Sequence, residues 1–141
     1  MDYTIELARV LRGSSPDAAF SFSSGSGADP TGKSRIAFAR YKGEAENGLL
    51  AAGFPSVYLF RPAYIYPVQP WKEPNFGYRL VCAIYPAFQL LFPNQAIRAD
   101  DLARAMVDVA IQGPERGGRV FENCDIRAMA KTIARKPEEG R

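Results

Sequence analysis

The chain has 141 residues, of which 47% are hydrophobic, and a formal net charge of +3. This length suits one domain with its own core, and no apolar run approaches the roughly 18 residues that a membrane span needs. Histidine is absent, which excludes serine–histidine and cysteine–histidine catalysis and the commonest zinc ligand sets. For these reasons we expect no metal site and no membrane partner. Lysine and arginine are spread along the chain, so we expect no nucleic acid as a partner either.

The first part of the chain predicts alternating helices and strands around a loop rich in glycine, serine and proline at 23–32. These are a helix at Thr4–Arg12 that stops at Gly13, a strand at Ala18–Ser23, an amphipathic helix from Ser34 to near Gly53, and a strand at Ser56–Phe60. The apolar positions expected to face inward are Leu7, Val10 and Leu11 in the first helix, and Phe38, Tyr41, Ala45, Leu49 and Ala52 in the second.

The second part continues the alternation. The predicted elements are an irregular proline-rich loop at Arg61–Asn75, an apolar helix at Gly77–Phe92, a helix at Asp100–Gln112 with Leu102, Ala105, Met106 and Val109 inward, a strand at Gly118–Glu122, a helix at Asp125–Arg135 and a polar tail at 136–141. Buried strands that alternate with helices predict a single α/β domain, with a parallel sheet of about three strands and flanking helices.

The segment Gly27–Ser34, GADPTGKS, matches the phosphate-binding loop of nucleotide triphosphatases letter for letter. In such a loop backbone amides cradle the phosphates, Lys33 would reach the terminal ones, and the Ser34 hydroxyl would meet magnesium. The other buried strand ends in Arg61-Pro62, where an aspartate would be needed to hold the metal. Nucleotide binding through Gly27, Gly32, Lys33 and Ser34 is therefore kept as an alternative.

The glycine fingerprint of dinucleotide-binding proteins is incomplete. Gly25 and Gly27 form a single Gly-x-Gly, and Pro30 stands where the third glycine should be. This loop is predicted to be the turn that leaves a strand.

Two segments carry a family resemblance: Phe38–Asn47 (FARYKGEAEN), with an inward lysine on a helix, and Ser56–Tyr66 (SVYLFRPAYIY), a buried strand that ends in Arg-Pro. Together they resemble the second half of an atypical short-chain dehydrogenase/reductase, of the NAD-dependent epimerase/dehydratase-like branch. The resemblance implies a partial, doubly wound Rossmann-like sheet that lacks the N-terminal nucleotide-binding strands, since too few residues precede Phe38 to form them.

The resemblance also implies roles for individual residues. Lys42 takes the position of the lysine that holds the nicotinamide ribose, and Ser24 falls near the catalytic serine. Arg61, Pro62 and Ala63 match the turn whose backbone meets the nicotinamide end of NAD(P). The tyrosine that transfers the proton is replaced by Phe38, which has no ionisable group.

The leading hypothesis is a truncated or divergent NAD(P)-dependent epimerase/dehydratase-like protein with little or no oxidoreductase activity, whose isolated chain does not bind the cofactor. A non-catalytic binding or oligomerisation module is the alternative. The strand at Ala18–Ser23 would have an unpaired edge, and the helix at Gly77–Phe92 is apolar all round, so a homodimer is expected. Cys82 and Cys124 fit reduced thiols, and the N-terminus resembles no secretion signal, so a cytoplasmic protein is expected. The sequence does not identify the small-molecule substrate.

Overall fold

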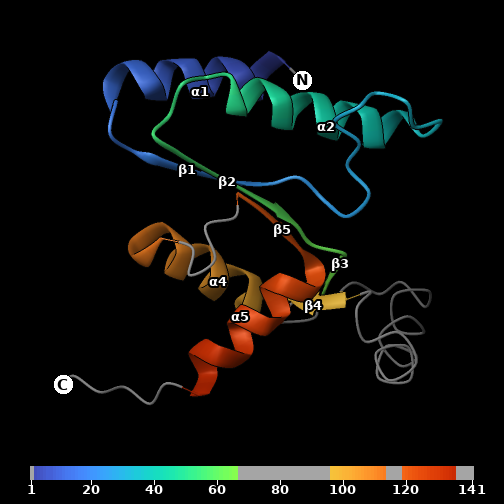
Figure 1. Cartoon of the computed structure of the whole chain (residues 1–141), viewed down its shortest axis with the longest axis vertical. Helices are drawn as coiled ribbons and strands as arrows, with labels where there is room; N and C mark the ends of the chain where they lie inside the picture. The colour runs from blue at the N-terminus through green and yellow to red at the C-terminus, as the bar shows by residue number, and fades with distance from the viewer. Residues whose placement is uncertain (1, 67–95, 114–118, 136–141) are drawn as a thin grey trace, which may run out of the picture.

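A computed structural model describes residues 2–66, 96–113 and 119–135, and Figure 1 shows the arrangement of their helices and strands. The elements are α1 (Asp2–Ser14), β1 (Ala19–Ser23), α2 (Ala37–Leu50), β2 (Ser56–Arg61), β3 (Tyr64–Tyr66), β4 (Ala96–Arg98), α4 (Ala99–Gln112), β5 (Val120–Glu122) and α5 (Asn123–Arg135).

The main sheet has three parallel strands in the order β1-β2-β5. Ala19 pairs with Ser56 at the start of the β1–β2 ladder, and Arg61 pairs with Glu122 at the end of the β2–β5 ladder. The predicted α/β class, with a small parallel sheet flanked by helices, is therefore confirmed. Among the described strands β1 pairs with β2 alone and lies at an edge.

A second, two-stranded parallel sheet joins β3 to β4. The prediction of an irregular loop from Arg61 onward was wrong for Tyr64–Tyr66, because these residues pair with Ala96–Arg98. A three-residue strand with proline on both sides gives almost no local signal, and its partner lies far along the sequence.

Helices cover both faces of the main sheet. In Figure 1, α1 and α2 lie on one side of the strands, and α4 and α5 lie on the other. Because side chains alternate along a strand, Val57 and Leu59 of β2 join the core under α1 and α2, whereas Tyr58 and Phe60 join the core under α4 and α5. β2 is the central strand of both cores.

The inward face predicted for the second helix was partly wrong. Ala45 and Leu49 are buried as expected, but Phe38 and Tyr41 are 60% and 59% exposed. The buried face instead carries three small residues, one acid and one leucine, namely Ala39, Gly43, Ala45, Glu46 and Leu49. The helix also begins at Ala37 rather than near Ser34.

The loop before α2 explains why the helix buries a different face from the predicted one. The Asp29 amide donates to the Ala39 carbonyl at 2.9 Å, and Asn47 Nδ2 donates to the Pro30 carbonyl at 2.9 Å. The backbone of Asp29 lies so close to Gly43 that a Cβ atom there would overlap it. Only small side chains fit between the loop and the helix, so the aromatic residues face outward.

The first helix was predicted in the right place, but with the wrong face inward. It continues through Gly13 to Ser14, and Ala8 is fully buried, whereas Leu7, Val10 and Leu11 are exposed. The buried side contacts α2 and the turn after it: Arg12 Nε donates to the Gly53 carbonyl at 2.8 Å.

The later helices agree well with the prediction. In α4 the side chains of Leu102, Ala105 and Val109 are buried, and Met106 packs against the same core. The strand predicted at Gly118–Glu122 is β5, and the helix predicted at Asp125–Arg135 is α5. The predicted helix at Gly77–Phe92, residues 67–75 of the proline-rich loop, Cys82 and the tail at 136–141 lie outside the described residues.

Candidate functional site

The candidate site lies where the three parallel strands end. Ser24 directly follows β1, Arg61 ends β2 and Glu122 ends β5. Because the carboxyl ends of parallel strands meet at one edge, these side chains gather there, in the region where open α/β sheets bind ligands. Glu46 joins them from α2, and the four residues are called the carboxyl-edge cluster below.

Glu46 and Arg61 form the centre of this cluster as a buried ion pair. Arg61 Nε donates to Glu46 Oε1 at 2.9 Å, and Arg61 Nη2 donates to Glu46 Oε2 at 2.6 Å. The side chains are only 2% exposed for Glu46 and 15% for Arg61. A parallel fork of this kind is the strongest geometry for an arginine–carboxylate pair, and it compensates for the cost of burying both charges.

Two further side chains complete the cluster. The Ser24 hydroxyl donates to Glu46 Oε1. Arg61 Nη1 donates to Glu122 Oε1 at 2.9 Å, and this carboxylate is 47% exposed. Three nitrogens of the guanidinium and both oxygens of Glu46 are therefore engaged within the chain.

The cluster contains two carboxylates and one cation, so its formal charge is −1. The pKa of the Arg61 guanidinium lies above its usual range, first because of its hydrogen bonds to Glu46 and then because of Glu122, which together outweigh the opposing effect of burial. Arg61 consequently stays charged throughout the accessible pH range.

The turn after β2 is held by its own backbone groups. Pro62 is buried, and its carbonyl accepts the Ser26 amide at 2.8 Å. The Ala63 amide donates at 3.0 Å to Oδ1 of Asn123, a buried residue at the start of α5. The positions expected to bring backbone against a nicotinamide are thus bonded to the loop after β1 and to α5.

Lys42 lies on α2 one turn before Glu46. Its ammonium is 5.7 Å from the centre of the Phe22 ring and 5.4 Å from that of the Phe38 ring, distances at which a cation is attracted to a ring face. Phe22 and Ser24 are two residues apart and share one side of β1 and its continuation. Both residues therefore connect β1 to α2. Lys42 lies over the ring of Phe22 of β1, and Ser24, which follows β1, donates to Glu46 of α2.

In the segment that matches a phosphate-binding loop, the carboxylate of Asp29 accepts the hydrogen bonds of the loop's own amides. Asp29 Oδ1 accepts the Thr31 amide at 2.9 Å and the Thr31 hydroxyl at 2.6 Å, and Asp29 Oδ2 accepts the Ser34 amide at 2.6 Å. These hydrogen bonds, with that from the Thr31 hydroxyl the strongest, lower the pKa of Asp29 to about 2. An anion bound by the amides of this loop would have to displace Asp29.

The start of the following helix also differs from a phosphate-binding loop, where Lys33 and Ser34 would open the helix. Here three residues separate Gly32 from Ile36, the residue that precedes α2. Gly27 and Gly32 have φ angles of 82° and 71°, so both serve as left-handed turn residues.

Sequence reasoning missed Glu46, although it lies in the segment that was quoted for the resemblance. The available signal was its spacing: Ala39, Gly43 and Glu46 recur at helical steps, and an acid on that line needs a cation from a strand end. Arg61 was predicted at the site, but its side chain binds the carboxylates of its own chain.

No group of three or more potential metal ligands occurs in the part of the chain that the structure describes. In the same residues, no helix combines the length and the apolarity needed to cross a membrane. A scan against protein-family models found no match, and a search of curated proteins found no relative. The short-chain dehydrogenase assignment therefore stays a prediction that depends on the residues quoted above.

Proposed function

We propose that this protein is a divergent, non-catalytic relative of the NAD(P)-dependent epimerase/dehydratase-like proteins, with little or no oxidoreductase activity. The observation that carries the proposal is the carboxyl-edge cluster. At the place where a reacting substrate would meet acid, base or cation, Ser24, Glu46, Arg61 and Glu122 bond to one another.

Proton transfer requires a group that can change its protonation state within reach of the substrate. The Ser24 hydroxyl is a donor to Glu46, and Phe38 offers a hydrocarbon ring where the family has a tyrosine. Lys42 has no ionisable tyrosine to activate on the preceding turn, and its ammonium lies over phenylalanine rings instead. These features support little or no oxidoreductase turnover.

The proposal includes NAD(P) only as the cofactor of the resembled family, and we expect no binding by the isolated chain. The incomplete glycine fingerprint and the closed Asp29 loop both support this expectation. A cytoplasmic location is part of the same proposal and is compatible with the exposed free thiol of Cys124.

The test is equilibrium titration of the whole chain with NADPH and with ATP–magnesium, together with turnover assays on aldehydes, ketones and nucleotide sugars. We expect no cofactor-dependent turnover and no binding at sub-millimolar concentrations. Turnover that disappears in Lys42→Ala would contradict the proposal. A heat of ATP binding that disappears in Lys33→Ala would instead favour the phosphate-loop alternative.

A second candidate function, an oligomerisation module, is favoured by the outer side of α1. Tyr3, Leu7, Val10 and Leu11 are all exposed and recur at the spacing of one helix face. β1 also lies at the edge of the described sheet. Apolar faces and strand edges of this kind are relieved by pairing, most simply in a two-fold homodimer.

Light scattering coupled to size exclusion tests this second candidate. We expect a dimer for the wild type and a monomer for Leu7→Glu. Val107→Glu, a matched change at an exposed position of α4, should leave the dimer intact. A stable wild-type monomer at micromolar concentration would contradict the dimer.

A further inference from the structure

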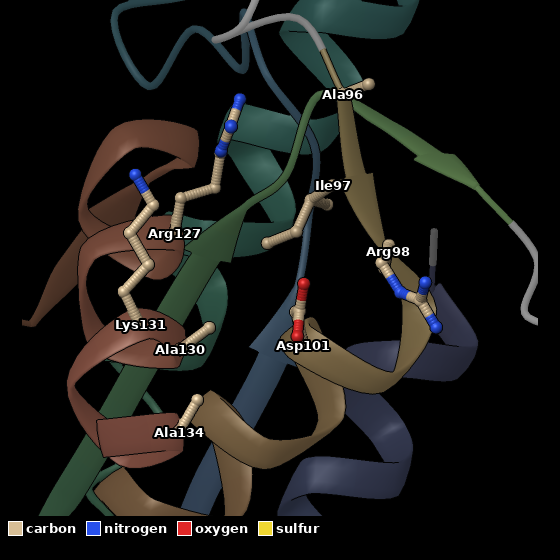
Figure 2. Close-up of a pocket in the computed structure, with 8 residues that line it drawn as sticks. All are labelled: Ala96, Ile97, Arg98, Asp101, Arg127, Ala130, Lys131 and Ala134. Carbon is tan, nitrogen blue, oxygen red and sulfur yellow. The ribbon is translucent and has the colours of Figure 1, made fainter. Parts of the chain in front are cut away.

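A pocket of about 150 Å³ lies between β4, α4 and α5, built from elements that contribute nothing to the carboxyl-edge cluster. Its lining residues, drawn in Figure 2, are Ala96, Ile97, Arg98, Asp101, Arg127, Ala130, Lys131 and Ala134. Half of them are apolar, and three of those are alanines, whose short side chains leave the space open.

The polar lining is mainly cationic. Arg127 and Lys131 are one turn apart on α5, and Figure 2 shows both side chains extending in the same direction. Arg98 contributes a third cation, which is shared with Asp100 through bonds of 3.0 Å from Nε and Nη2. Among the described residues, Asp101 is the only acid in the lining, and no ion pair joins it to Arg127 or Lys131.

Arg127 carries the clearest sign of a missing partner. Its Nη1 atom is buried, yet it has no hydrogen-bond partner within residues 2–66, 96–113 and 119–135. A buried donor on a charged group is costly when it is unpaired, and such atoms are rare in native proteins. Because Arg127 also lines the pocket, we take an anion bound there as the candidate partner of this residue.

The size of the pocket limits what this anion can be. A volume of 150 Å³ equals the volume that about five water molecules occupy in liquid water. Pockets that enclose drug-sized ligands or cofactors are roughly 300–1,000 Å³. A dinucleotide is therefore too large, whereas a phosphate group on a short carbon chain fits, with the alanines against its carbon atoms.

We propose that this pocket binds the phosphate group of a small phosphate monoester. Arg127 and Lys131 donate hydrogen bonds to the phosphate oxygens, as arginine and lysine commonly do. Asp101 accepts a hydrogen bond from a phosphate oxygen that keeps its proton, which is possible because the second pKa of a phosphate monoester is about 6. Asp101 would repel sulfate, which has no proton to donate at neutral pH.

The test is calorimetric titration of the full chain at pH 6.5 with inorganic phosphate, glycerol 3-phosphate and sulfate. We expect both phosphates to bind and sulfate to bind at least about tenfold more weakly. Arg127→Gln should weaken phosphate binding by about tenfold or more, as expected for a lost charge-assisted hydrogen bond. Lys131→Gln, a change at an exposed side chain that leaves the core intact, should also weaken it. Arg104→Gln, which removes the same charge from α4 outside the pocket, should leave it unchanged.

Three results would overturn the proposal. The first is that neither inorganic phosphate nor glycerol 3-phosphate gives a heat of binding at concentrations up to about ten millimolar, which is on the order of the weakest dissociation constant of interest. The second is equal affinity for phosphate and sulfate. The third is a loss of binding in Arg104→Gln as large as in Lys131→Gln, which would indicate attraction to the net charge of the protein. Because the probes and variants differ from those for NADPH, failure here and failure of the proposed function are distinguishable.

Discussion

The two faces of the main sheet are built on different principles, although β2 supplies the centre of both. Under α4 and α5 the core is aromatic and aliphatic: Tyr58, Phe60, Ile97, Leu102, Ala105, Val109, Phe121 and Ile126 form one cluster. Under α1 and α2 the buried cluster is smaller, with Ala8, Leu49, Phe54, Val57 and Leu59, and it ends at the carboxyl edge in the Glu46–Arg61 ion pair.

This difference follows from strand alternation. Val57, Leu59 and Arg61 are on the same side of β2, so the row that begins apolar must end with a charge facing α2. Apolar contacts tolerate small shifts, whereas a forked ion pair does not. The α1–α2 layer should therefore be more sensitive to the loss of one specific group, and the α4–α5 layer to the loss of volume.

Removing the acid of the ion pair gives the largest expected effect. Glu46→Ala should lower the free energy of unfolding by about 3–5 kcal/mol, because Arg61 would lose its buried partner. Chemical denaturation measures this. Glu44→Ala, at an exposed position of the same helix, should change stability by less than about 0.5 kcal/mol.

A double variant sharpens the interpretation of Glu46→Ala. Replacing both Glu46 and Arg61 by methionine removes the unpaired charge and should be less destabilising than Glu46→Ala alone. A double variant at least as unstable as Glu46→Ala would mean that packing, and not charge, holds α2 to the sheet.

Volume loss should matter on both faces and can be compared on adjacent residues. Phe60→Ala, toward α4 and α5, should cost about 3–5 kcal/mol, and Leu59→Ala, toward α1 and α2, about 2–5 kcal/mol. Both side chains are almost completely buried. Urea denaturation of each variant gives the values, and a cost within about 0.5 kcal/mol at Leu59 would contradict the position of β2.

The close approach of the Asp29 loop to α2 gives a smaller effect. Gly43→Ala should destabilise by about 1–3 kcal/mol, because its Cβ would overlap the backbone of Asp29 and Pro30. Gly48→Ala is the matched control: its Cβ would meet only the flexible end of Ile5, and alanine gains about 1 kcal/mol of helix propensity. Equal thermal stability of the two variants would show that the loop moves freely.

The smallest effect concerns pH. The pKa of Asp29 is lowered from its ordinary 3.8 to about 2, first by the Thr31 hydroxyl, so its contribution to stability is complete above about pH 4 and is lost as the pH falls through about 2. The difference in melting temperature between wild type and Asp29→Asn should disappear over this window. In Thr31→Val the pKa of Asp29 should be lowered less, so its contribution to stability should be smaller and should be fully lost at a higher pH than in the wild type. An unchanged acid limb would contradict this assignment.

Local patterns predicted the elements well where one apolar stripe packs on one surface. Leu102, Ala105 and Val109 of α4 form such a stripe, and the two acids at its start agree with the helix dipole. The same reasoning failed for α2, because Phe38 and Tyr41 are apolar by composition but are excluded from the interior by the nearby loop. A steric constraint from another segment has no periodic signal.

For the candidate site, too, the sequence pointed to some residues but not to their partners. Ser24, Lys42 and Arg61 were expected at a site because of the family resemblance, and the parallel sheet brings Ser24 and Arg61 to one edge. Their partners were not identified, because Glu46 becomes a partner only when α2 is rotated as the loop requires. The Arg127 pocket was not identified at all, since β4 has only three residues and its position depends on pairing with β3.

The amino-acid sequence by itself determined the α/β class, the two parallel strands predicted at Ala18–Ser23 and Ser56–Phe60, and the exclusion of histidine chemistry, because these depend on composition and on short-range periodicity. Only the tertiary structure decided which face of α2 is buried and which charges meet at the carboxyl edge. It also decided that Nη1 of Arg127 is buried without a hydrogen-bond partner among the described residues. The physical reason is that a helix or strand presents several faces at similar local cost. The choice among them is made by the volume and charge of residues that are distant in the sequence.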